Sequence, residues 1–498
     1  MTNILLWIDY GFLYFGISKY LQQKNFKVSA IIDGMSSTKN FFETQKLIKF
    51  EKIWNFENNA SDNIDYEYLK NFEKKYSINL WEIIFSDRYF YNKFNKYHKF
   101  NKNELLSILQ NECKLFENIL SEKKFDFVFM NTITHHYQQL FYKMCSSLGI
   151  TVLTLEPTRF GSKWIVITGS IYDWIPKPSP SSVELNFQTY DDIQNFLEEN
   201  RPAKYFHEQS NVSSKKSRFA KLHAMLEFTY STPSFPVKYT EYGRSKKNVL
   251  FKGMAIQHSR LRNKRQSFID KNFVSHISNF SNIVYFPLHL EPERVLLLGA
   301  PYYANQISVI ENICKCLPVD YTLFVKEHPA QYYEGWRNIE FYEKIMDLPN
   351  VELIHPSLNS DYIIENSSLV ISIRGTASLE AALKGKPSIV LKPDIGHSLV
   401  SSVYALETWD ELPKLIRNSL QTKCSPKDIV PYFSFIYENA FDFPNEYYSD
   451  ELANHFSYNL GYLKQPEIDD DNMNIFLEKF DNLYETLANE FIKKIQEP

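Results

Sequence analysis

A regular alternation of short apolar segments and amphipathic segments between residues 283 and 391 constrains the fold most strongly. The apolar segments are too short for helices and have the length and composition of buried strands, and the segments between them have helical periodicity. Five strands alternating with four helices predict a parallel sheet of Rossmann-like type, because parallel strands need crossover connections. The predicted strands are 283–286, 321–326, 351–354, 369–373 and 388–391, and the predicted helices are 303–316, 337–347, 359–366 and 376–384.

The N-terminal half contains a second, less regular set of strands and helices. Within it, the strand-helix-strand pattern from 125 to 155 predicts a parallel βαβ unit. The other expected strands are 4–8, 27–32 and 164–168, and the helices are 12–23, 65–75, 103–121 and 134–147. A chain of 498 residues is too long for one ordinary core, so we expect two α/β domains.

Four parts of the chain follow from this division. We expect an N-terminal Rossmann-like domain over 1–200, a linker with a basic helical segment over 201–280, and a second Rossmann-like domain over 281–440. Helical segments near 409–420, 447–460 and 472–495 end the chain, and those within 441–498 are expected to pack back towards the N-terminal domain.

Composition excludes several classes of protein. A net charge of −4 argues against a nucleic-acid-binding protein, although residues 244–271 hold nine Lys or Arg and one acid, Asp270, and could contact anionic headgroups or a phosphorylated acceptor. The five cysteines show no zinc-ligand spacing, so we expect reduced thiols and no metal. No segment has the ~18–20 apolar residues that span a bilayer. We therefore expect a cytoplasmic protein, with at most peripheral contact with the inner membrane.

Polar residues gather where two of the predicted strands end. The first strand leads into Lys326-Glu327-His328-Pro329. Because ligands of open parallel sheets bind outside the carboxyl ends of the strands, this group should face the same crevice as the next one. Proline fixes the turn after the strand, so His328 should project from the sheet and donate to a phosphate oxygen.

The second polar group follows the strand that ends near residue 373. Gly375 permits close approach of the backbone, and Thr376 is expected to cap the next helix, whose first amides favour an anion. The hydroxyls of Thr376 and Ser378 can donate to a phosphate, and Glu380 can accept from ribose hydroxyls. Together with His289, which follows the first strand of this domain, the two groups predict a nucleotide site.

The motifs VKEHP and GTASLEAALKGKP, some fifty residues apart, resemble those of the capsule polysaccharide synthesis glycosyltransferases, which include the bacterial β-Kdo transferases. The His-Pro and Ser/Thr motifs also recur in bacterial sialyltransferases and polysialyltransferases. The segment YFPLHLEPER extends the resemblance towards the surface-carbohydrate branch, so that it covers residues 283–392. It implies a GT-B fold, with two Rossmann-like domains facing a central cleft. It also implies that His328, Pro329, Thr376 and Ser378 bind the CMP part of an activated sugar, to which position and chemistry add Lys326 and Glu380.

The N-terminal domain should then supply the catalytic carboxylate and the acceptor site. Related sialyltransferases carry an acidic motif that ends in glycine. This chain offers Asp9 before Tyr10-Gly11, Asp33 before Gly34, and Glu156, each at the end of a predicted strand. Arg159 could pair with a sugar carboxylate or an acceptor phosphate. On the predicted helix 134–147, one of the pair His135-His136 could face the cleft.

These residues predict a metal-independent glycosyltransferase that moves Kdo or another nonulosonic acid from a CMP donor to a bacterial surface polysaccharide or lipopolysaccharide. Its partners would be the nucleotide-sugar donor and a glycan or lipid-linked glycan acceptor, without nucleic acid and without a further cofactor. Two alternatives keep the fold: a CDP-polyol phosphotransferase of the teichoic-acid type, which needs a second histidine, and a transferase that uses a UDP- or GDP-sugar. A non-catalytic module that binds polysaccharide is the third alternative.

Overall fold

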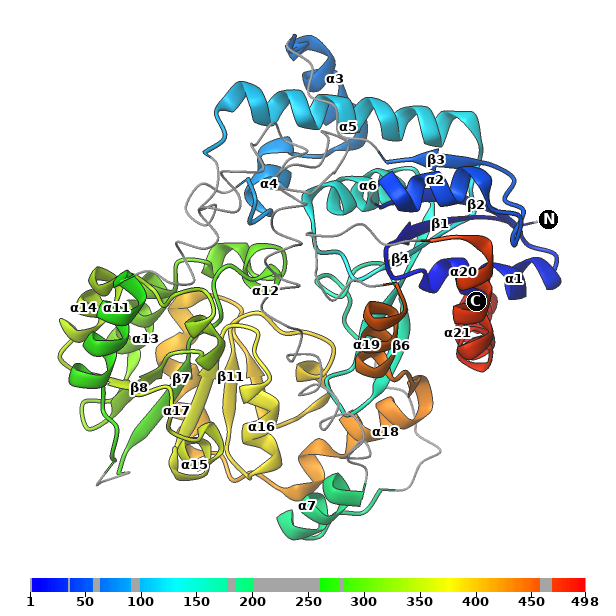
Figure 1. Cartoon of the computed structure of the whole chain (residues 1–498). Coiled ribbons are helices and arrows are strands. Elements are labelled where there is room, and N and C mark those ends of the chain that lie inside the picture. The colour runs from blue at the N-terminus through cyan, green and yellow to red at the C-terminus, as the bar shows by residue number, and fades with distance from the viewer. Residues whose placement is uncertain are drawn as a thin grey trace.

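The computed structural model describes residues 2–34, 36–56, 63–90, 99–176, 185–199, 260–277, 281–456 and 468–497. These residues form two α/β domains, each built around its own sheet (Figure 1). Most of the predicted linker 201–280 lies outside the described residues, as does the part of the basic stretch that precedes Arg260. The remainder of that stretch forms α11 (Arg260–Asn272), whose Ile269 is buried against the C-terminal domain.

The sheet of the C-terminal domain has six parallel strands in the order β12-β11-β10-β7-β8-β9. This is the doubly wound order, in which the direction of winding reverses between β7 and β10. Its sixth strand, β12, has only three residues and was not predicted. The strands are β7 (Ile283–Pro287), β8 (Thr322–Lys326), β9 (Val351–Ile354), β10 (Leu369–Ser372), β11 (Ser388–Val390) and β12 (Val403–Ala405).

Helices cover both faces of this sheet, and for that reason its strands are apolar along their whole length. The helices are α12 (Arg294–Leu297), α13 (Gln306–Cys316), α14 (Ile339–Met346), α15 (Ser360–Asn366), α16 (Ala377–Leu383), α17 (Leu412–Gln421) and α18 (Val430–Asn439). Short 3-10 helices lie at Pro301–Tyr303, Pro329–Tyr332, His397–Leu399, Trp409–Glu411 and Pro426–Ile429.

The sheet of the N-terminal domain has seven strands in the order β13-β6-β5-β4-β1-β2-β3. The strands β1 to β5 are parallel and reverse their winding between β1 and β4, whereas β6 and β13 are antiparallel to their neighbours. The sequence did not predict β3 or β13, which have three and two residues. The strands are β1 (Asn3–Asp9), β2 (Lys27–Asp33), β3 (Ile53–Asn55), β4 (Phe127–Asn131), β5 (Thr151–Pro157), β6 (Lys163–Thr168) and β13 (Phe441–Asp442).

The final helices of the described chain pack on the N-terminal domain, next to α1 (Figure 1). Gly16 of α1 lies directly against the ring of Tyr484, so any side chain at Gly16 would collide with that ring. The helices of this domain are α1 (Leu13–Gln23), α2 (Ser36–Thr44), α3 (Tyr66–Tyr76), α4 (Leu80–Phe85), α5 (Lys102–Glu122), α6 (His136–Ser147), α19 (Asn445–His455), α20 (Asp470–Lys479) and α21 (Asp481–Gln496). The helix α7 (Tyr190–Glu199) packs on α16 and α18 of the C-terminal domain.

The two domains touch through polar contacts as well as apolar packing. The Tyr432 hydroxyl donates to the Thr158 carbonyl at 2.9 Å, and the Arg374 guanidinium donates to the Ile171 carbonyl at 2.7 Å. The predicted fold class, two Rossmann-like domains facing each other in the GT-B manner, is confirmed by this topology. Within the described ranges, the helices are too short or too polar to cross a membrane.

Candidate functional site

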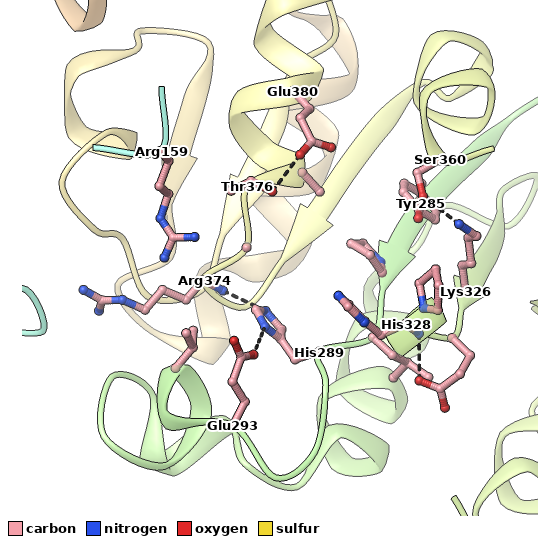
Figure 2. A pocket seen from close by; sticks show the side chains of 17 residues that line it. Arg159, Tyr285, His289, Glu293, Lys326, His328, Ser360, Arg374, Thr376 and Glu380 are labelled. Carbon is pink, nitrogen blue, oxygen red and sulfur yellow. Dashed lines mark hydrogen bonds and ion pairs between the residues drawn. The ribbon is translucent and has the colours of Figure 1, made fainter. Parts of the chain in front are cut away.

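A pocket of about 260 Å³ lies at the carboxyl ends of β7, β8 and β10, where the winding of the sheet reverses. We call it the C-terminal pocket (Figure 2). It brings together most of the residues that the sequence predicted for the nucleotide site, namely His289, Lys326, His328, Pro329, Gly375, Thr376 and Glu380. Arg159, which was predicted to bind the sugar or the acceptor, also lines it. Such a reversal point is where open α/β sheets bind their ligands.

Lys326 is the last residue of β8, and its side chain is directed towards the first turn of α15 (Figure 2). Its ammonium group donates to the Ser360 hydroxyl at 2.7 Å. Burial lowers the pKa of Lys326, against the opposing charges of Asp361 and Glu380. An ammonium group held in this way is available to a phosphate that enters the pocket.

His328 is fixed in one tautomer by its own turn. Its Nδ1 accepts a hydrogen bond from the Ala330 amide at 3.2 Å, so the neutral ring carries its proton on Nε2. Burial lowers the pKa of His328, which therefore stays neutral at neutral pH. The ring thus has one N–H donor left, and the following Pro329 begins a 3-10 helix that fixes the direction of the turn.

The Gly-Thr-x-Ser segment differs from its prediction in two respects. Thr376 does not cap α16, because its hydroxyl donates instead to the Glu380 carboxylate at 2.6 Å. Ser378 does not line the pocket: its side chain is fully buried and shares a hydrogen bond with Ser372 in β10 at 2.7 Å. The pocket therefore contains a Thr376–Glu380 pair rather than two free hydroxyls.

His289 lines the same pocket but already has partners for its ring. Its Nε2 accepts a hydrogen bond from the Arg374 amide at 3.3 Å, and its Nδ1 lies 3.9 Å from the Glu293 carboxylate. Although burial acts in the opposite direction, His289 holds the pKa of Glu293 below its usual value. These contacts join the loop after β7 to the loop after β10.

Arg159 reaches this pocket from the N-terminal domain. Its backbone has a φ of 67°, which is costly for a residue other than glycine. The guanidinium forms an ion pair with Asp394 at 3.0 Å, across the boundary between the domains. Although burial acts in the opposite direction, His397 and Arg159 hold the pKa of Asp394 well below its usual value. Arg159 thus links the pocket to the domain interface.

A second pocket, of about 700 Å³, lies at the corresponding reversal point of the other sheet, between the ends of β1 and β4. We call it the N-terminal pocket. Its polar wall comes mainly from strand ends and its apolar wall from β6 and α19. Its lining includes Asp9, Asn131, Thr132, Trp164, Arg294, Phe443 and Tyr448.

Asp9 is the predicted carboxylate that lines the N-terminal pocket. Each of its oxygens accepts a hydrogen bond, one from the Gly11 amide at 2.9 Å and the other from the Asn131 side chain at 2.9 Å. Both donors stabilise the ionised carboxylate and fix its position at the carboxyl end of β1.

Glu156 is fully buried and lies behind Thr132, whose hydroxyl donates to it at 2.7 Å. It lines neither pocket. Burial raises the pKa of Glu156 to about 7, an effect that Thr132 and the charges of Arg294 and Arg159 partly offset. Arg159 lines the C-terminal pocket and Arg294 lines the N-terminal pocket. The charge of Glu156 therefore interacts with one arginine from each pocket.

The other candidates of the N-terminal domain have structural contacts. Asp33 accepts from the Trp7 indole at 3.2 Å and from the Tyr137 hydroxyl at 3.1 Å, inside the core. The expectation that one of the pair His135-His136 faces the cleft is wrong for His136. This side chain is 1% exposed, and its two nitrogens contact buried carboxylates of Asp87 and Glu112 at 2.7 and 2.9 Å.

The buried carboxylates also explain the ionisation of His136. Against the effect of burial, Glu112 and Asp87 raise its pKa to about 9. The charged ring is thus compensated within the core. His135 precedes α6, and its ring stacks between Tyr89 and Tyr137. Both histidines are absent from the lining of the two pockets.

Several lining residues were missed in the sequence. Tyr285, Glu293 and Ser360 line the C-terminal pocket, and Arg294 lines the N-terminal one. Tyr285, Glu293 and Arg294 carried a signal, because they lie within the YFPLHLEPER segment, whereas Ser360 carried none. Over the described ranges, no group of three His, Cys, Asp or Glu side chains is placed to hold a metal ion.

The sequence matches no protein-family model and no curated protein. Among solved structures, KpsC, a β-Kdo 2,7 transferase of Thermosulfurimonas dismutans, is similar at 11% identity and a TM-score of 0.28 over 61% of this chain and 80% of that one. The UDP-GlcNAc 2-epimerase of Methanocaldococcus jannaschii is similar at 15% identity and a TM-score of 0.25, over 86% and 95% of the two chains. A glycosyltransferase of Rickettsia africae is similar at 12% identity and a TM-score of 0.24, over 97% of this chain and 99% of that one. TM-scores this low decide neither fold nor activity, which therefore rest on the topology and on the residues of the site.

Proposed function

We propose that the protein is a glycosyltransferase that moves Kdo or another nonulosonic acid from a CMP donor to a bacterial surface glycan. The observation that carries the proposal is the C-terminal pocket, where Lys326, His328 and Thr376 gather at the reversal point of a doubly wound sheet. A cation and a neutral N–H donor suit the single phosphate of a CMP-sugar.

The bond between the phosphate oxygen and the anomeric carbon breaks during transfer, so negative charge grows on the departing phosphate. Lys326 and the Nε2–H of His328 stabilise that charge more strongly in the transition state than in the bound donor, which is how such groups accelerate a reaction. Glu380, which already accepts from Thr376, has a second oxygen that can accept from the ribose hydroxyls.

The acceptor hydroxyl must lose its proton as its oxygen bonds to the anomeric carbon. We assign this proton to Asp9, because Asp9 lines the N-terminal pocket whereas Glu156 is buried behind Thr132. A carboxylate fixed by two donors is oriented for such a transfer. Glu156, whose pKa burial raises to about 7, lines neither pocket.

One observation favours this reaction over transfer of a polyol phosphate. The phosphotransferase alternative needs a second histidine with a free nitrogen, and His289 is the histidine that shares the pocket with His328. Its Nε2 is used by the Arg374 amide and its Nδ1 faces Glu293. His289 is therefore poorly suited to contact a transferred phosphate.

Calorimetry with a set of nucleotides tests the donor. The full chain is titrated with CMP, UDP and GDP, and its hydrolysis of CMP-Kdo, CMP-sialic acid, CDP-glycerol and UDP-sugars is followed. We expect binding of CMP and slow hydrolysis of a CMP-sugar. Binding of UDP or GDP alone, or hydrolysis of CDP-glycerol alone, would replace the proposed donor with one of the alternatives.

A further inference from the structure

Arg294 belongs to the C-terminal domain but lines the pocket of the other domain. It is the first residue of α12, a short helix on the side of its domain that faces the N-terminal domain (Figure 1). The residues on either side of it, Glu293 and Val295, line the C-terminal pocket. Consecutive residues at the start of α12 therefore line two different pockets.

The guanidinium of Arg294 has no hydrogen bond and no ion pair with any described residue, although the side chain is half-buried. A guanidinium keeps its charge at every pH at which proteins are folded. A cation that lines a pocket in this way is poorly compensated, and an anion is the ligand that compensates it best.

The other described side chains around the pocket leave this charge available. Asp9 and Arg294 are the two charged residues of the described lining. Asp9 already accepts from Gly11 and Asn131. Glu156, behind the wall, is only partly ionised at neutral pH because burial raises its pKa to about 7. Arg294 is therefore not neutralised from inside the pocket.

The remaining wall suits a sugar. Trp164, Phe443 and Tyr448 supply aromatic surface on the side of β6 and α19. An aromatic ring packs well against the apolar C–H face of a pyranose ring, whose hydroxyl groups project from the ring's edge. An anionic group at one end of the ring could then reach Arg294 while a hydroxyl group faces Asp9.

We propose that Arg294 binds a carboxylate or phosphate group of the acceptor, so that the N-terminal pocket selects an acidic sugar. The inference rests on the proposed function, because it assumes that this pocket holds the acceptor. It goes beyond that function by naming the chemical class of the acceptor and the residue that selects it.

The experiment uses three small probes with the full chain. Methyl glucuronide carries a carboxylate, glucose 6-phosphate carries a phosphate, and methyl glucoside is the neutral counterpart. Their affinities are measured by ligand-observed NMR for the wild type, R294Q, R294K and R417Q. The last is a matched control, since Arg417 is an exposed residue of α17 that lines neither pocket. CMP affinity is measured in parallel.

We expect the wild type and R417Q to bind at least one acidic probe about tenfold more tightly than methyl glucoside, the gain of one charge-assisted contact. In R294Q this preference should disappear, and R294K should keep part of it. A preference for the uronate alone or the sugar phosphate alone identifies the anion. Equal affinities for the three probes, or an unchanged preference in R294Q, would overturn the inference.

The CMP measurement separates this result from the proposed function. R294Q should bind CMP as the wild type does, because Arg294 does not line the C-terminal pocket. If R294Q loses CMP affinity as strongly as probe affinity, Arg294 serves the donor and the inference is wrong. Failure of the wild type to bind CMP would refute the proposed donor, whereas the probes would still report whether Arg294 selects anions.

Discussion

The two pockets occupy equivalent places in two similar sheets, yet they are built differently. In the C-terminal pocket the polar groups come largely from two short stretches of chain, and many already bind one another, as Thr376 and Glu380 do. The N-terminal pocket is larger and draws its walls from β1, β4, β6, α12 and α19. A reversal of winding therefore explains where each sheet has a pocket, but not which polar groups line that pocket. The first pocket is preorganised for a constant ligand, whereas the second combines a few polar anchors with an apolar wall.

The strongest test of this difference is Asp9→Asn. Removing the base should lower turnover by about 10²–10⁴-fold while the affinity for CMP stays unchanged, because only the N-terminal pocket is altered. Steady-state kinetics and calorimetry check the two quantities. Glu67→Gln, an exposed change on α3, is the control. Full turnover in D9N, together with loss of turnover in Glu156→Gln, would mean that Glu156 and not Asp9 is the catalytic base.

Glu156 should make the stability of the N-terminal side depend on pH. Its pKa in the folded chain is about 7, against an ordinary 4.5, so the protonated form is favoured on folding. The stabilisation is complete below pH 4.5 and is lost as the pH rises through 7, in all roughly 3 kcal/mol. Denaturant unfolding at pH 5 and pH 8 should show this loss in the wild type and its absence in E156Q. Parallel curves for both proteins would contradict the buried, protonated state.

On the other side of the comparison, Lys326→Met and His328→Gln should each weaken CMP binding about tenfold or more, the usual cost of a hydrogen bond to a charged group. The affinity for acceptor probes should not change. Calorimetry measures the first quantity and ligand-observed NMR the second. Lys414→Met, an exposed change on α17, is the control. Loss of probe affinity in the same variants would mean that the pockets are not independent.

The smallest effect is expected for Tyr448→Phe. The Tyr448 hydroxyl bonds the Gly11 carbonyl at 2.7 Å and the Tyr484 hydroxyl at 3.0 Å, which ties α19 to the end of β1. Its loss should cost about 1 kcal/mol of stability and raise the acceptor KM a few-fold, without a change in CMP affinity. Thermal unfolding and kinetics check this, and Tyr302→Phe, which is 96% exposed, serves as the control. Weakened CMP binding in Y448F would again mean that the two pockets are not independent.

The same contrast explains what the sequence could predict. Most strands and the longer helices of both domains were predicted because each is long enough to show its period, whereas β3, β12 and β13 have two or three residues and show none. The helices α2, α4, α12 and α18 were missed. Most of the C-terminal pocket was predictable, because Lys326, His328, Thr376 and Glu380 lie in two compact motifs.

The errors have a common physical origin in side-chain direction. The sequence places Thr376 and Ser378 together before a helix, but the helix start turns Ser378 into the core and leaves Thr376 bonded to Glu380. Arg294 could not be assigned to a pocket of the other domain, since nothing local indicates how two domains meet. The same holds for Glu156, whose strand end is covered by Thr132.

The return of the chain to its first domain has a consequence for synthesis. Residues 283–421 hold every strand of the C-terminal sheet and most of its helices, so that this sheet can form while the rest of the chain is still being translated. The core around β1 and α1 also requires Phe443, Tyr484 and Phe491. The N-terminal domain is therefore translated first but completed last. Its apolar strands stay exposed, and prone to aggregation, until α19, α20 and α21 have been translated and can pack on them.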